Sequence, residues 1–131
     1  MNPSVFIAFG KPSSGWLPVD LSYGDFHISF DASNVLNNPV AELRNVTENL
    51  QVGDCRKIEW WLEPAVYVFD FVKEGERVTF SIFEQDDLHD ENAEQRLLLS
   101  IAGDSKEILL PFTEALNAFY AKQYDERDWA A

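Results

Sequence analysis

Carboxylates are the most abundant side chains in this sequence that could do chemistry, and they are densest between residues 84 and 94. That stretch contains six acids and no Lys or Arg: Glu84, Asp86, Asp87, Asp90, Glu91 and Glu94. A calcium loop needs a glycine at a fixed position, and this run lacks it and has the wrong register. His89 has no second histidine nearby in the sequence to complete a metal site. We therefore predict no metal and no other cofactor, and either a solvated loop or a contact surface for a basic partner.

Nucleophilic catalysis would have to use one of very few residues. The chain has two histidines, His27 and His89, and one cysteine, Cys55. No nucleophile-elbow pattern surrounds any candidate, and the glycines are too scattered for a phosphate-binding loop. His27 falls on the polar side of an expected strand, near Asp25 and Ser29. We therefore predict a protein that is not an enzyme. The alternative is a small enzyme or a small-molecule-binding domain with a pocket near His27 or Cys55.

The net charge restricts the class of partner. The sequence has 23 acidic and 10 basic residues, which gives a formal charge of −13. Nucleic acids and anionic membrane surfaces are bound by clustered Lys and Arg, and this sequence has no basic run, so neither is expected as a partner. A strongly negative field favours a basic protein, because opposite charges speed the encounter. The alternative is that the charge only keeps the protein in solution.

Two adjacent tryptophans, Trp60 and Trp61, occupy an expected strand. Successive strand residues point to opposite faces, so if Trp60 faces the helices, Trp61 lies on the outer face. The residues Glu59 and Glu63 share that outer face with Trp61. An exposed indole between carboxylates suits a cationic protein, through cation–π attraction and acidic steering. We therefore expect Glu59, Trp61 and Glu63 to bind a partner together with the acids of residues 84–94.

Two other arrangements of Trp61 are compatible with the sequence. In the first, residues 16–21 cover its indole. In the second, outward aromatic side chains such as Trp61 and Phe83 are buried in a homodimer, as in a structural or assembly subunit.

Alternating apolar and polar residues predict most of the strands. Pro18 restricts its strand to an edge or a bulge, because proline lacks a backbone N–H. Short turns join three consecutive strands in the middle of the chain, which predicts an antiparallel meander. The expected strands are residues 5–9, 16–21, 26–31, 57–63, 66–72, 77–83 and 95–102.

Apolar residues spaced by three and four predict two helices. The first covers residues 36–50. Its N-cap is Ser33 or Asn34, or else Asn38 with Pro39 in the first turn. The second begins after a turn at residues 103–105 and places Pro111 near its first turn, where a helix tolerates proline best.

These elements predict a single α+β domain over residues 1–131, an antiparallel meander with both helices packed on one face. Hydrophobic residues make up 46% of the 131 residues, enough for a core without disulfides or metals. Cys55 has no partner for an internal disulfide, and the apolar stretch at residues 5–9 is too short for a signal sequence. We therefore expect a cytoplasmic protein with no membrane association.

The arrangement resembles the small acidic immunity proteins that bacteria encode beside polymorphic or contact-dependent toxins. The resemblance is carried by the helix at residues 36–50, the segment at 60–69, the strand at 77–83 and the closing helix at 108–124. These are features of shape and composition, and no signature motif accompanies them. The resemblance implies a non-enzymatic inhibitor that binds and occludes a toxin, often a basic nuclease. It assigns no catalytic or contact residue to this chain.

Overall fold

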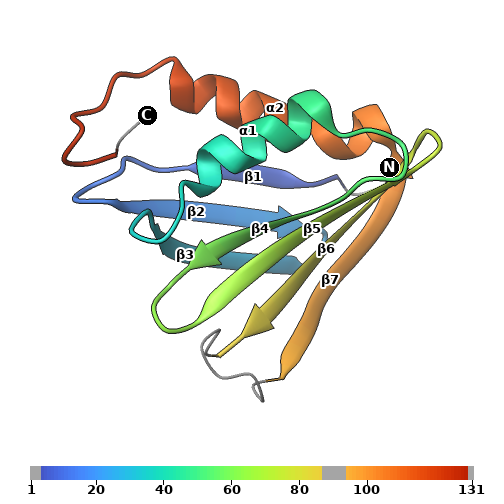
Figure 1. The fold of residues 1–131 in the computed structure, drawn as a ribbon, viewed down its shortest axis with the longest axis horizontal. Helices are drawn as coiled ribbons and strands as arrows, with labels where there is room; N and C mark the ends of the chain where they lie inside the picture. The colour runs from blue at the N-terminus through green and yellow to red at the C-terminus, as the bar shows by residue number, and fades with distance from the viewer. Residues whose placement is uncertain (1–3, 87–93, 130–131) are drawn as a thin grey trace.

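The computed structural model describes residues 4–86 and 94–129, which form one antiparallel sheet covered by two helices (Figure 1). The strands occupy the sheet in the order of the sequence, as a meander. Both helices lie on the same face, which confirms the predicted α+β class. The elements are β1 (Phe6–Phe9), β2 (Trp16–Tyr23), β3 (Phe26–Ser33), α1 (Pro39–Asn49), β4 (Cys55–Trp61), β5 (Val66–Glu74), β6 (Arg77–Gln85), β7 (Gln95–Asp104) and α2 (Ser105–Tyr120).

The core lies between the sheet and the helices, and aromatic rings fill its centre. The ring of Phe112, from α2, lies 5.3 Å from that of Phe71 and 5.0 Å from that of Phe80, in edge-to-face arrangements. Such pairs stabilise a core beyond the gain from burying their area. Helix α1 adds the fully buried Val40 and Leu43. The periodic apolar stripes predicted for the two helices therefore face the sheet, apart from their ends.

The sheet consists of two parts that meet at one point. Strands β2 and β3 pair along their whole length, but among the described residues β3 and β4 pair only through Ser33 and Trp61. From that point the two strands diverge, and α1 and the loop before it lie along the open side of β4 (Figure 1). Phe30 and Tyr67, with ring centroids 4.9 Å apart, pack across the gap. The divergence leaves the start of β4, residues 55–57, exposed to solvent, whereas its end at Trp60 and Trp61 is buried.

Helix α1 begins at Pro39, so only one of the two predicted starts is correct. The side chain of Asn38 accepts a hydrogen bond from the Ala41 N–H at 3.2 Å and caps the helix. A start at Ser33 or Asn34 is wrong, because Ser33 is the last residue of β3. Leu36 consequently lies outside the helix, in the loop that precedes it, and is 54% exposed.

Two predictions about proline are also wrong. Pro111 lies inside α2 and not in its first turn. Strand β2 is neither an edge strand nor bulged at Pro18, because β1 and β3 flank it. Pro18 is tolerated there because it lies opposite Gly10, just past the end of β1, where the Gly10 N–H donates to its carbonyl at 2.8 Å. A Cβ atom on Gly10 would lie 2.9 Å from the Pro18 Cβ, so this close approach requires glycine.

Candidate partner-binding site

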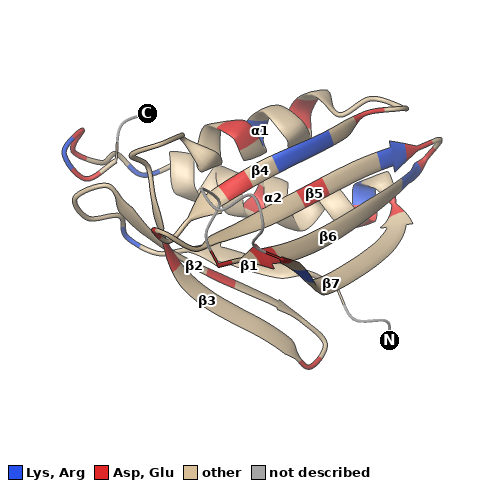
Figure 2. Ribbon diagram, turned by 60° about the horizontal axis from the view of Figure 1, so that its bottom comes forward, with Lys and Arg blue, Asp and Glu red and all other residues tan. Residues whose placement is uncertain are grey.

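The charges of the described residues are distributed unevenly along strands β4 to β7 (Figure 2). Towards the β5–β6 turn, four basic residues are nearly balanced by five acidic ones: Arg56, Lys57, Lys73 and Arg77, with Asp54, Asp70, Glu74, Glu76 and Asp104. At the other end of the same strands, five acids accompany one base: Glu59, Glu63, Glu84, Asp86 and Glu94, with Arg96. The excess negative charge of these four strands is therefore concentrated where β4 ends.

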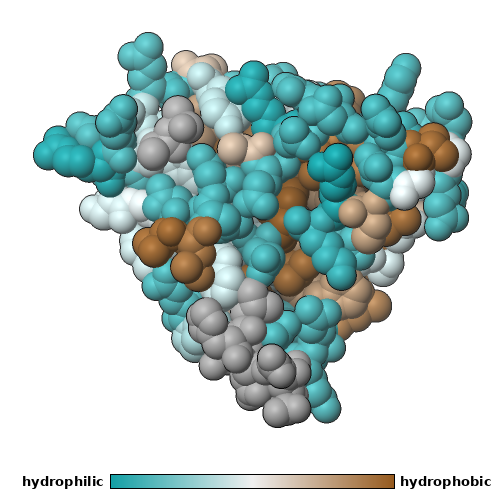
Figure 3. Space-filling model, in the orientation of Figure 1, coloured by the Kyte–Doolittle hydropathy of each residue, from teal (hydrophilic) through white to brown (hydrophobic). Residues whose placement is uncertain are grey.

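A hollow of about 420 Å³ opens at this end of the sheet. It is lined by Leu36, Trp61, Glu63 and Pro64, and we call it the Trp61 hollow. The loop beside it presents Val35 and Leu36, which are 75% and 54% exposed. Figure 3 shows a hydrophobic group on this side of the molecule, where the β3–α1 loop meets the end of β4. The hollow thus combines exposed aliphatic side chains with a carboxylate.

A buried serine connects the loop to the turn after β4. The Ser33 hydroxyl donates to the Glu63 carboxylate at 3.2 Å and accepts from the Val35 N–H at 3.1 Å. Because buried polar groups are held firmly when their hydrogen bonds are satisfied, this pair fixes the loop against the turn. The apolar side chains of the loop are therefore presented by a positioned backbone.

Trp61 points to the outer face, as predicted, but its indole is not an exposed anchor. The side chain is 6% exposed and packs with Val66, Val68 and Phe83 in a small cluster apart from the main core. Trp60, its neighbour, is fully buried in that main core. The expected exposed indole is wrong, because β5 and β6 supply an apolar surface for it on the outer face. Residues 16–21 contribute instead to the main core.

Glu59 lies near a second carboxylate, that of Glu42, which was not predicted from the sequence as a site residue. Asn37 holds the two chain segments together, since its Nδ2 donates to the Glu42 carboxylate at 2.7 Å and to the Glu59 carbonyl at 2.8 Å. Partial burial raises the pKa of Glu59, and the negative charge of Glu42 raises it further. Among the described residues, the ion pairs do not include Glu42, Glu59 or Glu63. Within the described part of the chain, no Lys or Arg therefore neutralises the charge of these three carboxylates.

The acids of β6 are arranged differently, because Arg96 pairs with them from β7. Its guanidinium donates to Glu84 at 2.5 Å and to Asp86 at 2.6 Å, which lowers the pKa of Asp86. Glu84 also faces away from Glu59, towards Tyr67, whose pKa rises through burial and through the neighbouring Glu84. The structure therefore places Glu59 and Trp61 on one face of the sheet, with Glu63 beside Trp61 in the hollow, and it places Glu84 on the other face.

The remaining predicted acids give a mixed result. Glu94 is exposed immediately before β7. Asp87, Asp90 and Glu91 lie outside the described residues, as does His89. Within residues 4–86 and 94–129, no three His, Cys, Asp or Glu side chains come together as a metal site.

The surroundings of His27 contain the residue types of a catalytic triad without its geometry. Asp20 Oδ1 lies 3.5 Å from His27 Nε2, and Ser29 Oγ lies 3.4 Å from the same nitrogen. Ser29 also donates directly to Asp20. In a triad the acid and the hydroxyl occupy different ring nitrogens. All three side chains are exposed, so they form a surface hydrogen-bond cluster.

Cys55 is not poised as a nucleophile. The residue is exposed, its thiol donates to the Asp70 carboxylate at 3.4 Å, and limited desolvation together with Asp70 raises its pKa. A protonated thiol is a weak nucleophile. Neither His27 nor Cys55 lines the Trp61 hollow or the hollow of about 530 Å³ between β1 and α2.

Sequence reasoning missed Val35, Leu36 and Glu42. Leu36 was assigned to a helix stripe because it stands four residues before Val40. The Asn38-Pro39 pair was the available signal that the helix starts later and leaves both aliphatic residues in a loop. Glu42 became relevant only when α1 was placed against β4, and the sequence holds no sign of that contact.

The fold and the hollow define an α+β protein with an acidic, partly apolar surface. Comparisons with protein families, with curated proteins and with solved structures find no match for this chain. Among the described residues, neither helix has the length and apolar character needed to cross a membrane.

Proposed function

We propose that this chain is a non-enzymatic protein-binding module, most concretely an immunity-type inhibitor that binds and occludes a basic toxin, such as a nuclease. The observation that carries the proposal is the Trp61 hollow, where the exposed side chain of Leu36 lies beside the carboxylate of Glu63. Protein interfaces combine an apolar centre with a polar rim in this way. The single cysteine and the acidic charge suit a cytoplasmic protein that meets its partner there.

The electrostatics of Glu59 support a cationic partner. Its carboxylate is partly buried and lies near Glu42, so its charged form is disfavoured in the free protein. A Lys or Arg of a partner would neutralise both carboxylates and remove this penalty on binding. A solvated acidic surface that only maintained solubility would have no need for a partly buried carboxylate such as Glu59 beside a second acid.

Binding to the product of the adjacent gene tests the proposal. We expect a complex whose affinity falls steeply as salt is raised, because exposed charges are screened beyond about 10 Å at 0.1 M salt. An affinity that does not change between low and high ionic strength would remove the electrostatic argument.

A matched pair of variants localises the site. Glu42→Gln/Glu59→Gln removes two charges where α1 meets β4, and Glu74→Gln/Glu76→Gln removes two charges at the β5–β6 turn. We expect the first to weaken binding by about tenfold, which corresponds to about 1.4 kcal/mol, and the second to leave it nearly unchanged. Leu36→Ser tests the apolar contact in the same assay. Equal effects of both double variants would show that only total charge matters.

A further inference from the structure

We infer that the free edge of β1 and the adjoining face of α2 form a docking groove for an extended basic segment of a partner protein, which adds to the sheet as a strand. This inference goes beyond the proposed function and does not depend on it. The groove lies along β1, at the edge of the sheet, whereas the Trp61 hollow lies where β3 meets β4.

The backbone of β1 presents unused hydrogen-bonding groups on this side. Gly10 bonds to Pro18, and antiparallel bonds recur at every second residue, so Ala8 and Phe6 bond to β2. The N–H and C=O groups of Ile7 and Phe9 therefore point away from β2. No described residue pairs with these groups, so the edge can accept another strand.

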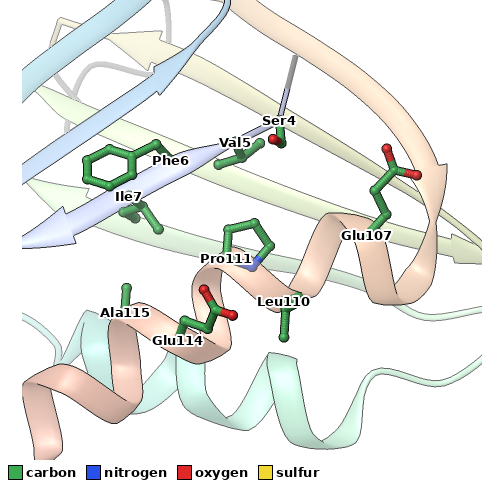
Figure 4. Close-up of a pocket in the computed structure, with 9 residues that line it drawn as sticks. All are labelled: Ser4, Val5, Phe6, Ile7, Glu107, Leu110, Pro111, Glu114 and Ala115. Carbon is green, nitrogen blue, oxygen red and sulfur yellow. The ribbon is translucent and has the colours of Figure 1, made fainter. Parts of the chain in front are cut away.

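The space beside that edge is open. A hollow of about 530 Å³ separates the first part of β1 from α2, and a second of about 140 Å³ continues along the same strand. Both are lined by Phe6, Ile7 and Ala115. In Figure 4, Val5 and Ile7 extend from the strand towards α2, where Pro111 and Ala115 face them across the hollow.

Pro111 adds a further acceptor to the groove. Proline has no N–H, so it cannot donate to the carbonyl of Glu107 four residues earlier. Both residues line the larger hollow. A peptide in the groove would thus meet unused backbone groups on the strand side and, on the helix side, a carbonyl that lacks its usual donor four residues later.

The charge of the groove selects its occupant. Glu107 and Glu114 line the larger hollow and no Lys or Arg does, while Lys122 lines the smaller one at the far end. A second copy of this chain, with a net charge of −13, would bring the two carboxylates against their own equivalents. An extended segment that alternates apolar and basic residues fits both the apolar walls and the acidic rim.

The test uses the full chain and a synthetic peptide that alternates Lys and Val over about seven residues. In an NMR titration, we expect peptide binding to shift the backbone amide resonances of Ile7 and Phe9. We also expect it to slow the hydrogen exchange of these two amides. The same peptide N-methylated at each central residue should bind about tenfold more weakly, since it has lost the N–H groups that a strand donates. A Glu-Val peptide should also bind more weakly. Equal binding of all three peptides would overturn the inference.

Two variants of the protein complete the test. Glu107→Lys/Glu114→Lys should weaken binding of the Lys-Val peptide, whereas Glu74→Lys/Glu76→Lys changes the total charge equally at a distant turn and should not. Glu42→Gln/Glu59→Gln should leave peptide binding intact. A negative result for the proposed function can therefore be distinguished from a negative result for the groove. Peptide-induced shifts confined to the Trp61 hollow would refute the groove. So would a concentration-dependent dimer that protects the Ile7 and Phe9 amides without peptide, because a second copy would then be the occupant.

Discussion

Replacing Glu59 by Gln is expected to make the free protein more stable at neutral pH. The Glu59 carboxylate is partly buried and close to Glu42, and its pKa is raised for both reasons. A carboxyl group whose folded pKa exceeds its unfolded pKa opposes folding once it ionises. Gln keeps the shape of the side chain and removes the charge, so it removes this penalty.

The size of the effect follows from the partial exposure of Glu59. Water screens much of the interaction, so we expect a gain of a few tenths of a kcal/mol at about pH 7. In a chain of this length, that gain raises the thermal midpoint by about 1–2 °C. The penalty is absent below the ordinary carboxyl pKa of about 4.3 and grows as pH rises through the raised pKa. The difference in stability between wild type and variant should therefore vanish near pH 3.5, which is about one unit below that ordinary pKa.

Thermal and urea unfolding between these pH values measure the effect, and Glu48→Gln is the matched control. Glu48 Oε1 accepts from Arg44 Nε at 3.1 Å, so its neutralisation should leave stability unchanged or lower it slightly at neutral pH. In a Glu42→Gln background, the gain from Glu59→Gln should shrink, because part of the penalty comes from Glu42. A loss of stability in Glu59→Gln at pH 7, or a gain that persists at acid pH, would refute the reasoning.

Three further substitutions test other parts of the structure. Phe112→Ala leaves a cavity in the centre of the core and should lower the free energy of unfolding by about 3–5 kcal/mol in urea titrations, while a loss under 1 kcal/mol would contradict that burial. Asn38→Ala removes the cap that accepts from Ala41 and should lower stability by about 1 kcal/mol, whereas Asn38→Ser should retain most of it. Arg96→Leu should raise the pKa of Asp86 towards its usual range, and an NMR titration that finds this pKa unchanged would show that the guanidinium is not its cause.

Much of the candidate site could not be read from local sequence. Glu59 and Glu63 alternate with Trp61 on a strand, and that alternation places them on one face in any sheet. The burial of Trp61 depends on Val66, Val68 and Phe83, whose contact with it arises only when β5 and β6 pair beside β4. Counting acids likewise suggested a continuous negative surface at residues 84–94.

The pairing of β7 with β6 changed that surface. Arg96 lies opposite Glu84 in the register of the two strands, and from there it reaches Asp86 as well. No spacing rule along the chain links these residues, because they belong to different strands. The position of Glu42 against Glu59 has the same origin, since α1 must pack beside β4 before the two carboxylates approach each other.

The sequence by itself determined the elements and the class of fold. Alternation of apolar and polar residues produced the strands, spacings of three and four produced the helices, and short turns at Gly24 and Gly75 made the meander antiparallel. These features are local, because each residue's side is set by the geometry of its own strand or helix. Tertiary structure alone decided which carboxylates stay unpaired, which tryptophan is covered on the outer face and where the sheet opens. Those outcomes depend on contacts between residues far apart in the chain, whose partners are fixed only when the strands and helices pack together.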